Sequence, residues 1–95
     1  MTLNEIFNLF KKRGVCDTYQ VLTKFKNYKA EMQAFYKELN KFSYYNSFFR
    51  VKVKLVEKGI ISIKKRYEKI YIRLTKKGIN IYNKLEEINE LIRKK

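Results

Sequence analysis

The fold of this chain is decided by residues 48–78, which read FFRVKVKLVEKGIISIKKRYEKIYIRLTKKG. A helical pattern runs up to Gly59, a residue that often ends helices because it tolerates a left-handed backbone. Two short segments rich in β-branched residues follow, at 60–64 and 69–74, and predict a basic β-hairpin. A further helix is expected at 76–93. The stretch therefore predicts a helix, a basic hairpin and a helix in succession.

Four helices are predicted before the hairpin, because apolar residues recur at helical spacing. Thr2 and Glu5 form a capping box at the start of the first, and Gly14 is expected to stop it. The four helices are expected at 3–13, 18–26, 30–40 and 44–58. The expected N-caps of the second, fourth and last helices are Asp17, Ser43 and Thr75.

The helix at 44–58 has apolar residues on two sides, which an ordinary surface helix does not. The side expected to face the core carries Tyr44, Phe48, Val51 and Leu55. The side expected to face outward carries Tyr45, Asn46, Phe49, Arg50 and Val53. An aromatic and polar outward face indicates a contact surface.

Composition describes one small, strongly basic domain. The chain has 95 residues, enough for a single compact core, and 45% of them are hydrophobic. Lys and Arg outnumber Asp and Glu by 23 to 9, giving a net charge of +14 and a pI of about 9.9. Such an excess favours a polyanion as partner: DNA, RNA or an anionic membrane surface. The alternative is a basic domain without a polyanion partner.

Several classes of site are not expected. Histidine is absent and Cys16 is the one cysteine, so neither a transition-metal site nor an internal disulfide is predicted. Cys16 is expected to be buried or half-buried in a reducing cytosol, with a bridge between two copies left open. Catalytic residues and cofactors are not expected, since there is no histidine, glycine-rich phosphate loop or nucleophile motif.

No apolar run approaches the length of a membrane span, and the N-terminal charges follow the apolar residues, unlike a secretory signal. A cytoplasmic protein is therefore expected.

Two short helices, a tight turn and a third helix predict a helix-turn-helix, and the hairpin after it predicts a wing. In that motif the third helix enters the major groove of DNA. Arginine binds guanine, asparagine binds adenine, and an aromatic ring can pack on the thymine methyl. The alternative is that Phe49 and Val53 contact another protein. The candidate DNA-binding residues on and before this helix are Ser43, Tyr44, Tyr45, Asn46, Phe49, Arg50 and Lys54.

The hairpin tip is expected to contact phosphates or enter a minor groove, where arginine is favoured. Its candidate residues are Lys64, Lys65, Arg66 and Lys69. The alternative is that these charges only keep the edge strands from aggregating. Further phosphate candidates are Lys24, Lys26, Lys29, Lys41, Lys52 and Lys54.

The terminal helices carry more apolar residues than a core of this size requires, and the last one shows the spacing of a coiled-coil seam. We expect them to form a homodimer interface; the alternative is packing on their own domain. The residues concerned are Leu3, Ile6, Phe7, Phe10, Ile81, Leu85, Ile88 and Ile92.

Two motifs resemble those of MarR-type winged-helix regulators. LVEKGII at 55–61 resembles the end of their recognition helix, and YIRLTKKG at 71–78 resembles their passage from wing to last helix. The resemblance covers about residues 17–85. The chain is similar also to small winged-helix proteins encoded by archaeal viruses and plasmids.

The resemblance implies a symmetric dimer bound to a pseudo-palindromic operator, usually as a repressor. It places Tyr45, Asn46, Phe49 and Arg50 in the groove and Lys65 and Arg66 at the wing tip. The terminal helices are shorter than in that family, and an aspartate usual in the wing is not evident, so a small-molecule effector is not expected.

The expected fold is mainly α with a two-stranded wing in a single domain: a dimer helix at 1–14, a winged-helix core at 17–75 and a dimer helix at 76–95. The expected function is sequence-specific binding of double-stranded DNA by a homodimeric transcription regulator, in the host cytoplasm if the protein is viral. Two alternatives are a protein-interaction module and a non-specific nucleic-acid-binding protein.

Overall fold

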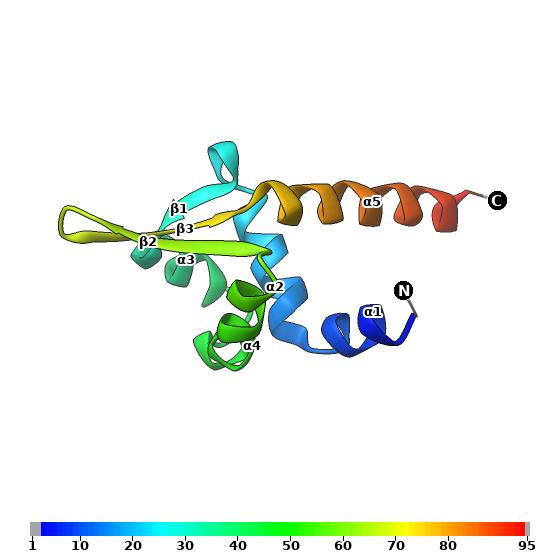
Figure 1. The fold of residues 1–95 in the computed structure, drawn as a ribbon, viewed down its shortest axis with the longest axis horizontal. Coiled ribbons are helices and arrows are strands. Elements are labelled where there is room, and N and C mark those ends of the chain that lie inside the picture. The colour runs from blue at the N-terminus through cyan, green and yellow to red at the C-terminus, as the bar shows by residue number, and fades with distance from the viewer. Residues whose placement is uncertain (1–2, 95) are drawn as a thin grey trace.

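The computed structural model describes residues 3–94, apart from the side chains of Leu3 and Tyr45. The predicted capping residue Thr2 lies outside the described residues. Within them, five α-helices accompany a three-stranded antiparallel sheet (Figure 1). The helices are α1 (Leu3–Phe10), α2 (Arg13–Leu22), α3 (Met32–Leu39), α4 (Tyr45–Glu57) and α5 (Lys76–Arg93). The strands are β1 (Lys29–Glu31), β2 (Ile61–Arg66) and β3 (Lys69–Leu74), with a short 3-10 turn at Lys26–Tyr28 before β1.

The predicted succession of helix, hairpin and helix is confirmed, and α5 has the predicted bounds. The protein is mainly helical with a small sheet, an arrangement compatible with a winged-helix fold. Thr75 caps α5 as predicted, since its Oγ1 accepts a hydrogen bond from the Gly78 backbone N at 3.0 Å. In Figure 1, α3 and α4 lie below the sheet.

The prediction that Gly14 stops the first helix is wrong. The chain breaks earlier, after Phe10, and Gly14 lies inside α2. The reason for glycine there is close packing, because an added Cβ would lie 1.9 Å from the Ser47 carbonyl oxygen of α4. The predicted helix cap at Asp17 is wrong as well, since that residue is buried within α2.

The predicted helix at 30–40 begins too early, and the expected two-stranded wing has a third strand. Residues Lys29–Glu31 form β1, which pairs antiparallel with β3 in the sheet order β1-β3-β2. Asn27 and Tyr28, with φ of 58° and 54°, redirect the chain just before it. A three-residue strand is too short to show a pattern of its own, so only pairing with β3 defines it.

The core lies between the helices and the inner face of the sheet. Phe35 of α3 and Phe48 of α4 are fully buried with their ring centroids 4.8 Å apart in an edge-on arrangement. Ile72 of β3 and Leu55 of α4 are also buried, and belong to the same cluster. The predicted inward stripe of the helix at 44–58 is therefore confirmed at Phe48, Val51 and Leu55.

A stack of aromatic rings joins the terminal helices to this core. Tyr19 of α2 lies between Phe10 of α1 and Tyr82 of α5, with centroids 6.2 Å and 6.0 Å away. Its hydroxyl donates a hydrogen bond to the Gly78 carbonyl at 3.1 Å, and burial raises the pKa of Tyr19 to about 12. Tyr19 therefore ties α2 to the first turn of α5.

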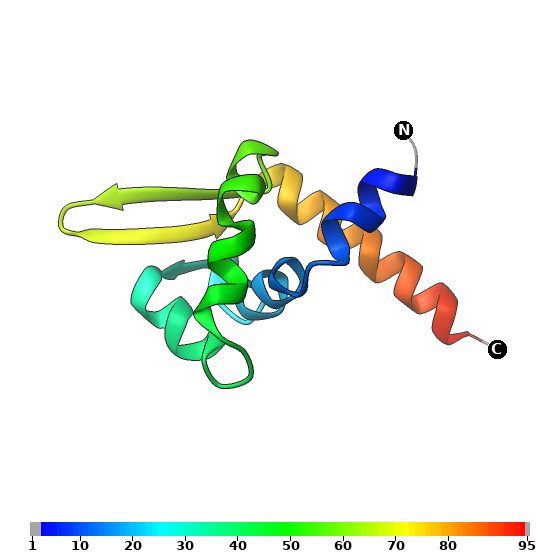
Figure 2. The ribbon, with the colours of Figure 1, turned by 90° about the horizontal axis from the view of Figure 1, so that it is seen from below.

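The outer part of α5 extends beyond the core, with α1 beside it (Figures 1 and 2). This gives the molecule extents of 48 × 26 × 24 Å. An apolar groove of about 700 Å³ runs between these two helices, with Ile6, Leu9 and Phe10 on one wall and Ile81, Leu85 and Ile88 on the other.

Candidate nucleic-acid interface

A buried carboxylate fixes the start of α4 against α2. Asp17 is 5% exposed, and its Oδ2 accepts hydrogen bonds from Ser43 Oγ at 2.7 Å and Ser47 Oγ at 3.2 Å. Arg13 Nε lies 3.5 Å from the same oxygen, and its guanidinium also donates to the Phe42 carbonyl at 3.0 Å. These contacts hold the turn before α4 in place. The sequence pattern did not indicate the hydrogen bonds of Asp17 to Ser43 and Ser47, because those residues are 26 and 30 positions away.

The prediction that Ser43 caps α4 is wrong. Tyr44 occupies the N-cap position without a side-chain cap, and Ser43 donates to Asp17 instead. Ser43 was also predicted to contact DNA; the structure gives its hydroxyl a partner inside the protein.

The other end of α4 stops at Gly59, as predicted. Gly59 has φ of 72°, and Ile60 N donates to the Leu55 carbonyl at 2.9 Å, which is the hydrogen bond of a Schellman motif. Lys77 Nζ donates to the Lys58 carbonyl at 2.7 Å, which satisfies a further carbonyl at this end. The helix is thus anchored at both ends.

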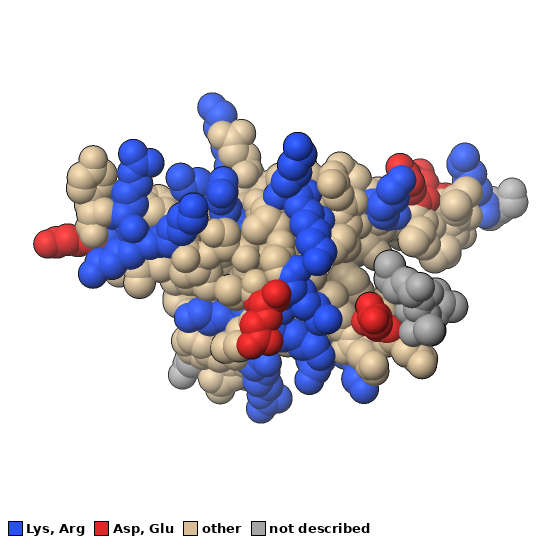
Figure 3. Space-filling view, in the orientation of Figure 1, with Lys and Arg blue, Asp and Glu red and all other residues tan. Residues whose placement is uncertain are grey.

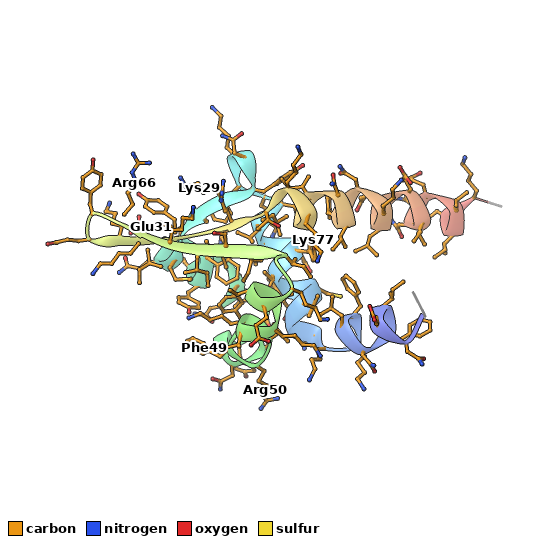
Figure 4. The ribbon with its side chains drawn as sticks, viewed as in Figure 1. Lys29, Glu31, Phe49, Arg50, Arg66 and Lys77 are labelled. Atoms are coloured by element: carbon orange, nitrogen blue, oxygen red, sulfur yellow. The ribbon has the colours of Figure 1, made fainter. Side chains whose placement is uncertain are left out.

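The surface of α4 that faces away from the core carries polar and apolar residues side by side. Asn46 and Arg50 are exposed, Phe49 is 46% exposed and Val53 is 65% exposed. Arg50 points away from the protein in Figure 4. We call this surface the α4 face: Asn46, Phe49, Arg50 and Val53.

The other candidates around α4 differ in position. Tyr44 was expected on the inward stripe, which is wrong, because it is 80% exposed. The Tyr45 side chain lies outside the described residues, and Lys54 is half-buried. Phe49 packs against Tyr36 with ring centroids 5.9 Å apart, and Lys52 Nζ lies 5.7 Å from its ring.

Three of the four predicted wing cations, Lys64, Lys65 and Arg66, line one depression, although they do not all start from the same face of the hairpin. Antiparallel pairing places Lys64 opposite Tyr71, Arg66 opposite Lys69 and Lys65 opposite Ile70. Because paired residues share a face and successive residues alternate, Lys64, Arg66 and Lys69 lie on one face and Lys65 on the other. The turn is also tighter than expected, with only Tyr67 and Glu68 between the strands.

Four residues that were not predicted as site residues, Glu31, Ser62, Tyr71 and Arg73, join the face that carries Lys64, Arg66 and Lys69. Ser62 pairs with Arg73, which in turn pairs with Lys29 of β1, and Tyr71 pairs with Glu31. The sequence signal for these residues was the alternation of polar and apolar side chains along β3. It could not be used to assemble the face until β1 was recognised as a strand. Figure 3 shows Lys and Arg gathered over the hairpin and the helices below it, with Asp and Glu scattered.

The remaining phosphate candidates come from several different elements. Lys41 Nζ pairs with Glu38 at 2.5 Å, Lys24 Nζ lies 5.6 Å from the Phe42 ring, and Lys26 is exposed in the turn before β1. Lys29 lies on the sheet and Lys52 on α4. Of these, Lys52 borders the α4 face, since its Nζ lies 5.7 Å from the Phe49 ring.

Five of the predicted dimer residues, Ile6, Phe10, Ile81, Leu85 and Ile88, line the groove between α1 and α5. Phe10 and Ile81 are half-buried against the chain's own core, and Leu85 is half-buried in the groove. Farther out, apolar side chains are increasingly exposed: Ile6 38%, Ile88 51%, Phe7 62% and Ile92 76%. The Leu3 side chain lies outside the described residues. Leu9, which was not predicted, is the buried residue of α1, at 7% exposed.

Cys16 is exposed, so the expectation of a buried or half-buried cysteine is wrong. Its Sγ lies 3.9 Å from the Phe10 carbonyl oxygen. Partial burial of the sulfur and the nearby Asp17 carboxylate raise the pKa of the thiol above its ordinary value.

No family model, curated protein or solved structure matches this chain. In the described part of the chain, no helix has both the length and the apolar character needed to cross a membrane. Residues 3–94 also contain no cluster of His, Cys, Asp and Glu side chains that could hold a metal ion.

Proposed function

We propose that this chain is a cytoplasmic, sequence-specific double-stranded DNA-binding protein that regulates transcription as a homodimer, with the winged-helix architecture of MarR-type regulators. The observation that carries the proposal is the α4 face on its fixed scaffold. Asn46 and Arg50 project from a helix that is anchored at both ends, in a protein of net charge +14. Arginine and asparagine are the side chains that read guanine and adenine in the major groove.

Affinity in this proposal comes mostly from lysines on phosphates, and specificity from the α4 face. Phe49, at 46% exposed, offers an apolar edge to a thymine methyl beside Arg50. Ordering α4 costs little on binding, because the contacts of Asp17 already hold its first turn.

The groove between α1 and α5 supports the homodimer. Phe7, Ile88, Leu91 and Ile92 are all more than half exposed at the outer ends of these helices. A second copy that places its own α5 against this region would cover them, and its two α4 helices would then read an inverted repeat. Sedimentation equilibrium tests the dimer; a monomer at micromolar concentration would contradict it.

The first experiment is selection of bound duplexes from a random pool at about 150 mM salt. An inverted repeat with half-sites about 10 base pairs apart is expected. Affinity for the selected site should fall steeply with salt, by a log–log slope of about −0.9 for each phosphate contact. A slope near zero would refute nucleic-acid binding, and a pool without enrichment would refute sequence specificity.

Arg50→Ala directly tests the residue that is proposed to contact the bases. We expect it to cost about 1–3 kcal/mol on the selected site and little on random duplex. Arg93→Ala is the matched control, because Arg93 lies at the far end of α5, where it forms an exposed ion pair with Glu90. Equal losses on both duplexes would make Arg50 a phosphate contact.

A second candidate function is docking on another protein. Val53 and Val56 lie on the same side of α4 and are 65% and 44% exposed. Together they expose more apolar surface than a helix that binds a DNA groove needs. Binding to a protein that is insensitive to salt and abolished by Val53→Ser would favour this function.

A further inference from the structure

We propose that the outward face of the sheet is a second nucleic-acid site, which binds a single strand. This face, called the outer sheet face below, is separate from the α4 face and independent of the function proposed for it. Its residues, from the pairing of the three strands, are Lys29, Glu31, Ser62, Lys64, Arg66, Lys69, Tyr71 and Arg73.

The outer sheet face is hollowed and basic. A depression of about 270 Å³ is lined by six residues of this face, Lys29, Ser62, Lys64, Arg66, Tyr71 and Arg73, together with Lys65 from the other face of β2. The cations come from all three strands, so the sheet itself holds them at fixed spacings. The opposite face is the apolar one that packs on the core, with Ile61, Ile63 and Ile72 in the same strands.

The positive charge on this face is largely unbalanced. Among the described residues, its one ion pair joins Lys69 Nζ and Glu31 Oε2 at 3.8 Å. Charges that only protect against aggregation are needed on edge strands. Arg73 lies on β3, the central strand, so edge protection does not account for it. A line of bound phosphates accounts for the charge of Arg73.

Aromatic rings among the cations favour a single strand over a duplex. The Tyr71 ring is half-buried in the depression with Lys29 Nζ 4.9 Å from its centroid, and Tyr67 at the turn is 88% exposed. A single strand supplies phosphates for the cations and unstacked bases for the rings, whereas a duplex keeps its bases inside. A membrane surface would supply phosphates but no base.

The two sites lie on different sides of the molecule. In Figure 4, Lys29 and Arg66 lie above the sheet, whereas Phe49 lies beside α4 and Arg50 lies below it. The core between them is formed by α2, α3 and the inner face of the sheet. One copy can therefore hold a duplex and a single strand at the same time.

Fluorescence anisotropy with a labelled oligothymidylate of about 15 nucleotides tests this site, since single-strand sites span about 4–16 nucleotides. The double variant Lys64→Gln/Arg66→Gln should weaken binding about tenfold or more, by loss of phosphate contacts. Lys11→Gln/Lys12→Gln is the matched control of equal charge, on the exposed link between α1 and α2, and should change affinity far less. Equal loss in both pairs would mean that net charge alone binds the strand, which overturns the site.

The stacking role of the Tyr71 ring is tested separately. Tyr71→Leu should weaken strand binding about fivefold or more, and Tyr71→Phe should restore it, because stacking needs the ring and not the hydroxyl. Thermal melting of each variant by circular dichroism confirms that it is folded. Equal affinities of folded Tyr71→Leu and Tyr71→Phe would overturn stacking.

Competition and vesicle binding complete the test. A saturating unlabelled duplex should leave the strand bound, and Arg50→Ala should leave strand affinity unchanged; displacement by the duplex would mean one shared surface. Anionic phosphatidylserine vesicles bound by the outer sheet face, with no strand binding, would assign it to membranes instead. Failure of the strand site leaves duplex selection by α4 untouched, so the two proposals fail independently.

Discussion

Gly14→Ala should destabilise the protein strongly, although alanine is the better helix former. Gly14 lies in α2, where exchanging glycine for alanine ordinarily stabilises a helix by about 1 kcal/mol. Here the added Cβ would lie 1.9 Å from the Ser47 carbonyl oxygen, and 3.0 Å from Val51 Cγ2. The sign of the effect therefore separates helix propensity from tertiary packing.

The size of the expected loss of stability follows from how far α2 and α4 must move apart. The Ser47 oxygen belongs to the backbone of α4 and cannot rotate away, so α2 and α4 must separate by about 1 Å to reach a tolerable contact. Overpacking of this kind costs about 1–3 kcal/mol. Loss of the hydrogen bond between Ser47 and Asp17, now 3.2 Å, adds about 1 kcal/mol. After the gain of about 1 kcal/mol in helix propensity, we expect a net loss of about 1–3 kcal/mol, or about 4–24 °C in Tm.

Urea and thermal denaturation followed by circular dichroism measure this loss. Gln20→Ala is the control, because Gln20 is an exposed position of the same helix and should shift the free energy of unfolding by less than about 0.5 kcal/mol. An unchanged or raised stability of Gly14→Ala would refute the close approach of α2 to α4. The scaffold argued for the α4 face would then fail with it.

Three further predictions concern the same scaffold. Gly59→Ala should cost about 1–2 kcal/mol from its φ of 72° alone, since the nearest atom to an added Cβ is 3.9 Å away; Gly59→Asn should cost less, and a larger loss for Asn would contradict a left-handed cap. Tyr19→Phe should lower the free energy of unfolding by about 0.5–1.5 kcal/mol at neutral pH, by loss of the hydrogen bond to Gly78. Because folding raises the pKa of Tyr19 from 10.0 to about 12, its protonated form contributes stability that is complete below pH 10 and is lost as the pH rises toward 12. Urea denaturation across that range should show a steeper decline for the native protein than for Tyr19→Phe, and parallel declines would show that Tyr19 is not buried. Cys16 should react with iodoacetamide at pH 8 more slowly in the folded protein than in urea, because its raised pKa leaves less thiolate; Asp17→Asn should speed the folded reaction, and equal rates would rule out the effect of the carboxylate.

Local signals in the sequence were sufficient wherever one residue type determines the backbone by itself. Gly59 ends α4 because glycine adopts a positive φ without strain, and Thr75 begins α5 because its hydroxyl accepts the hydrogen bond of a nearby backbone N–H. Apolar periodicity also predicted the buried side of α4, because every third or fourth residue of a helix lies on the same face. The same pattern also showed which residues of α4 face outward, including all four residues of the α4 face.

Only the tertiary structure decided the features that depend on a distant partner. The local sequence predicts Gly14 as a helix stop, and only the packing of α4 against it shows why glycine is there. It predicts Asp17 as a helix cap, and only the fold brings the hydroxyls of Ser43 and Ser47 to its carboxylate. The outer sheet face is hidden in the same way, because Lys29 joins Arg73 and Tyr71 only once β1 pairs with β3 across more than forty residues of chain. Sequence alone determines what a residue does to its own backbone; what it touches across the fold depends on the packing of elements that no local pattern records.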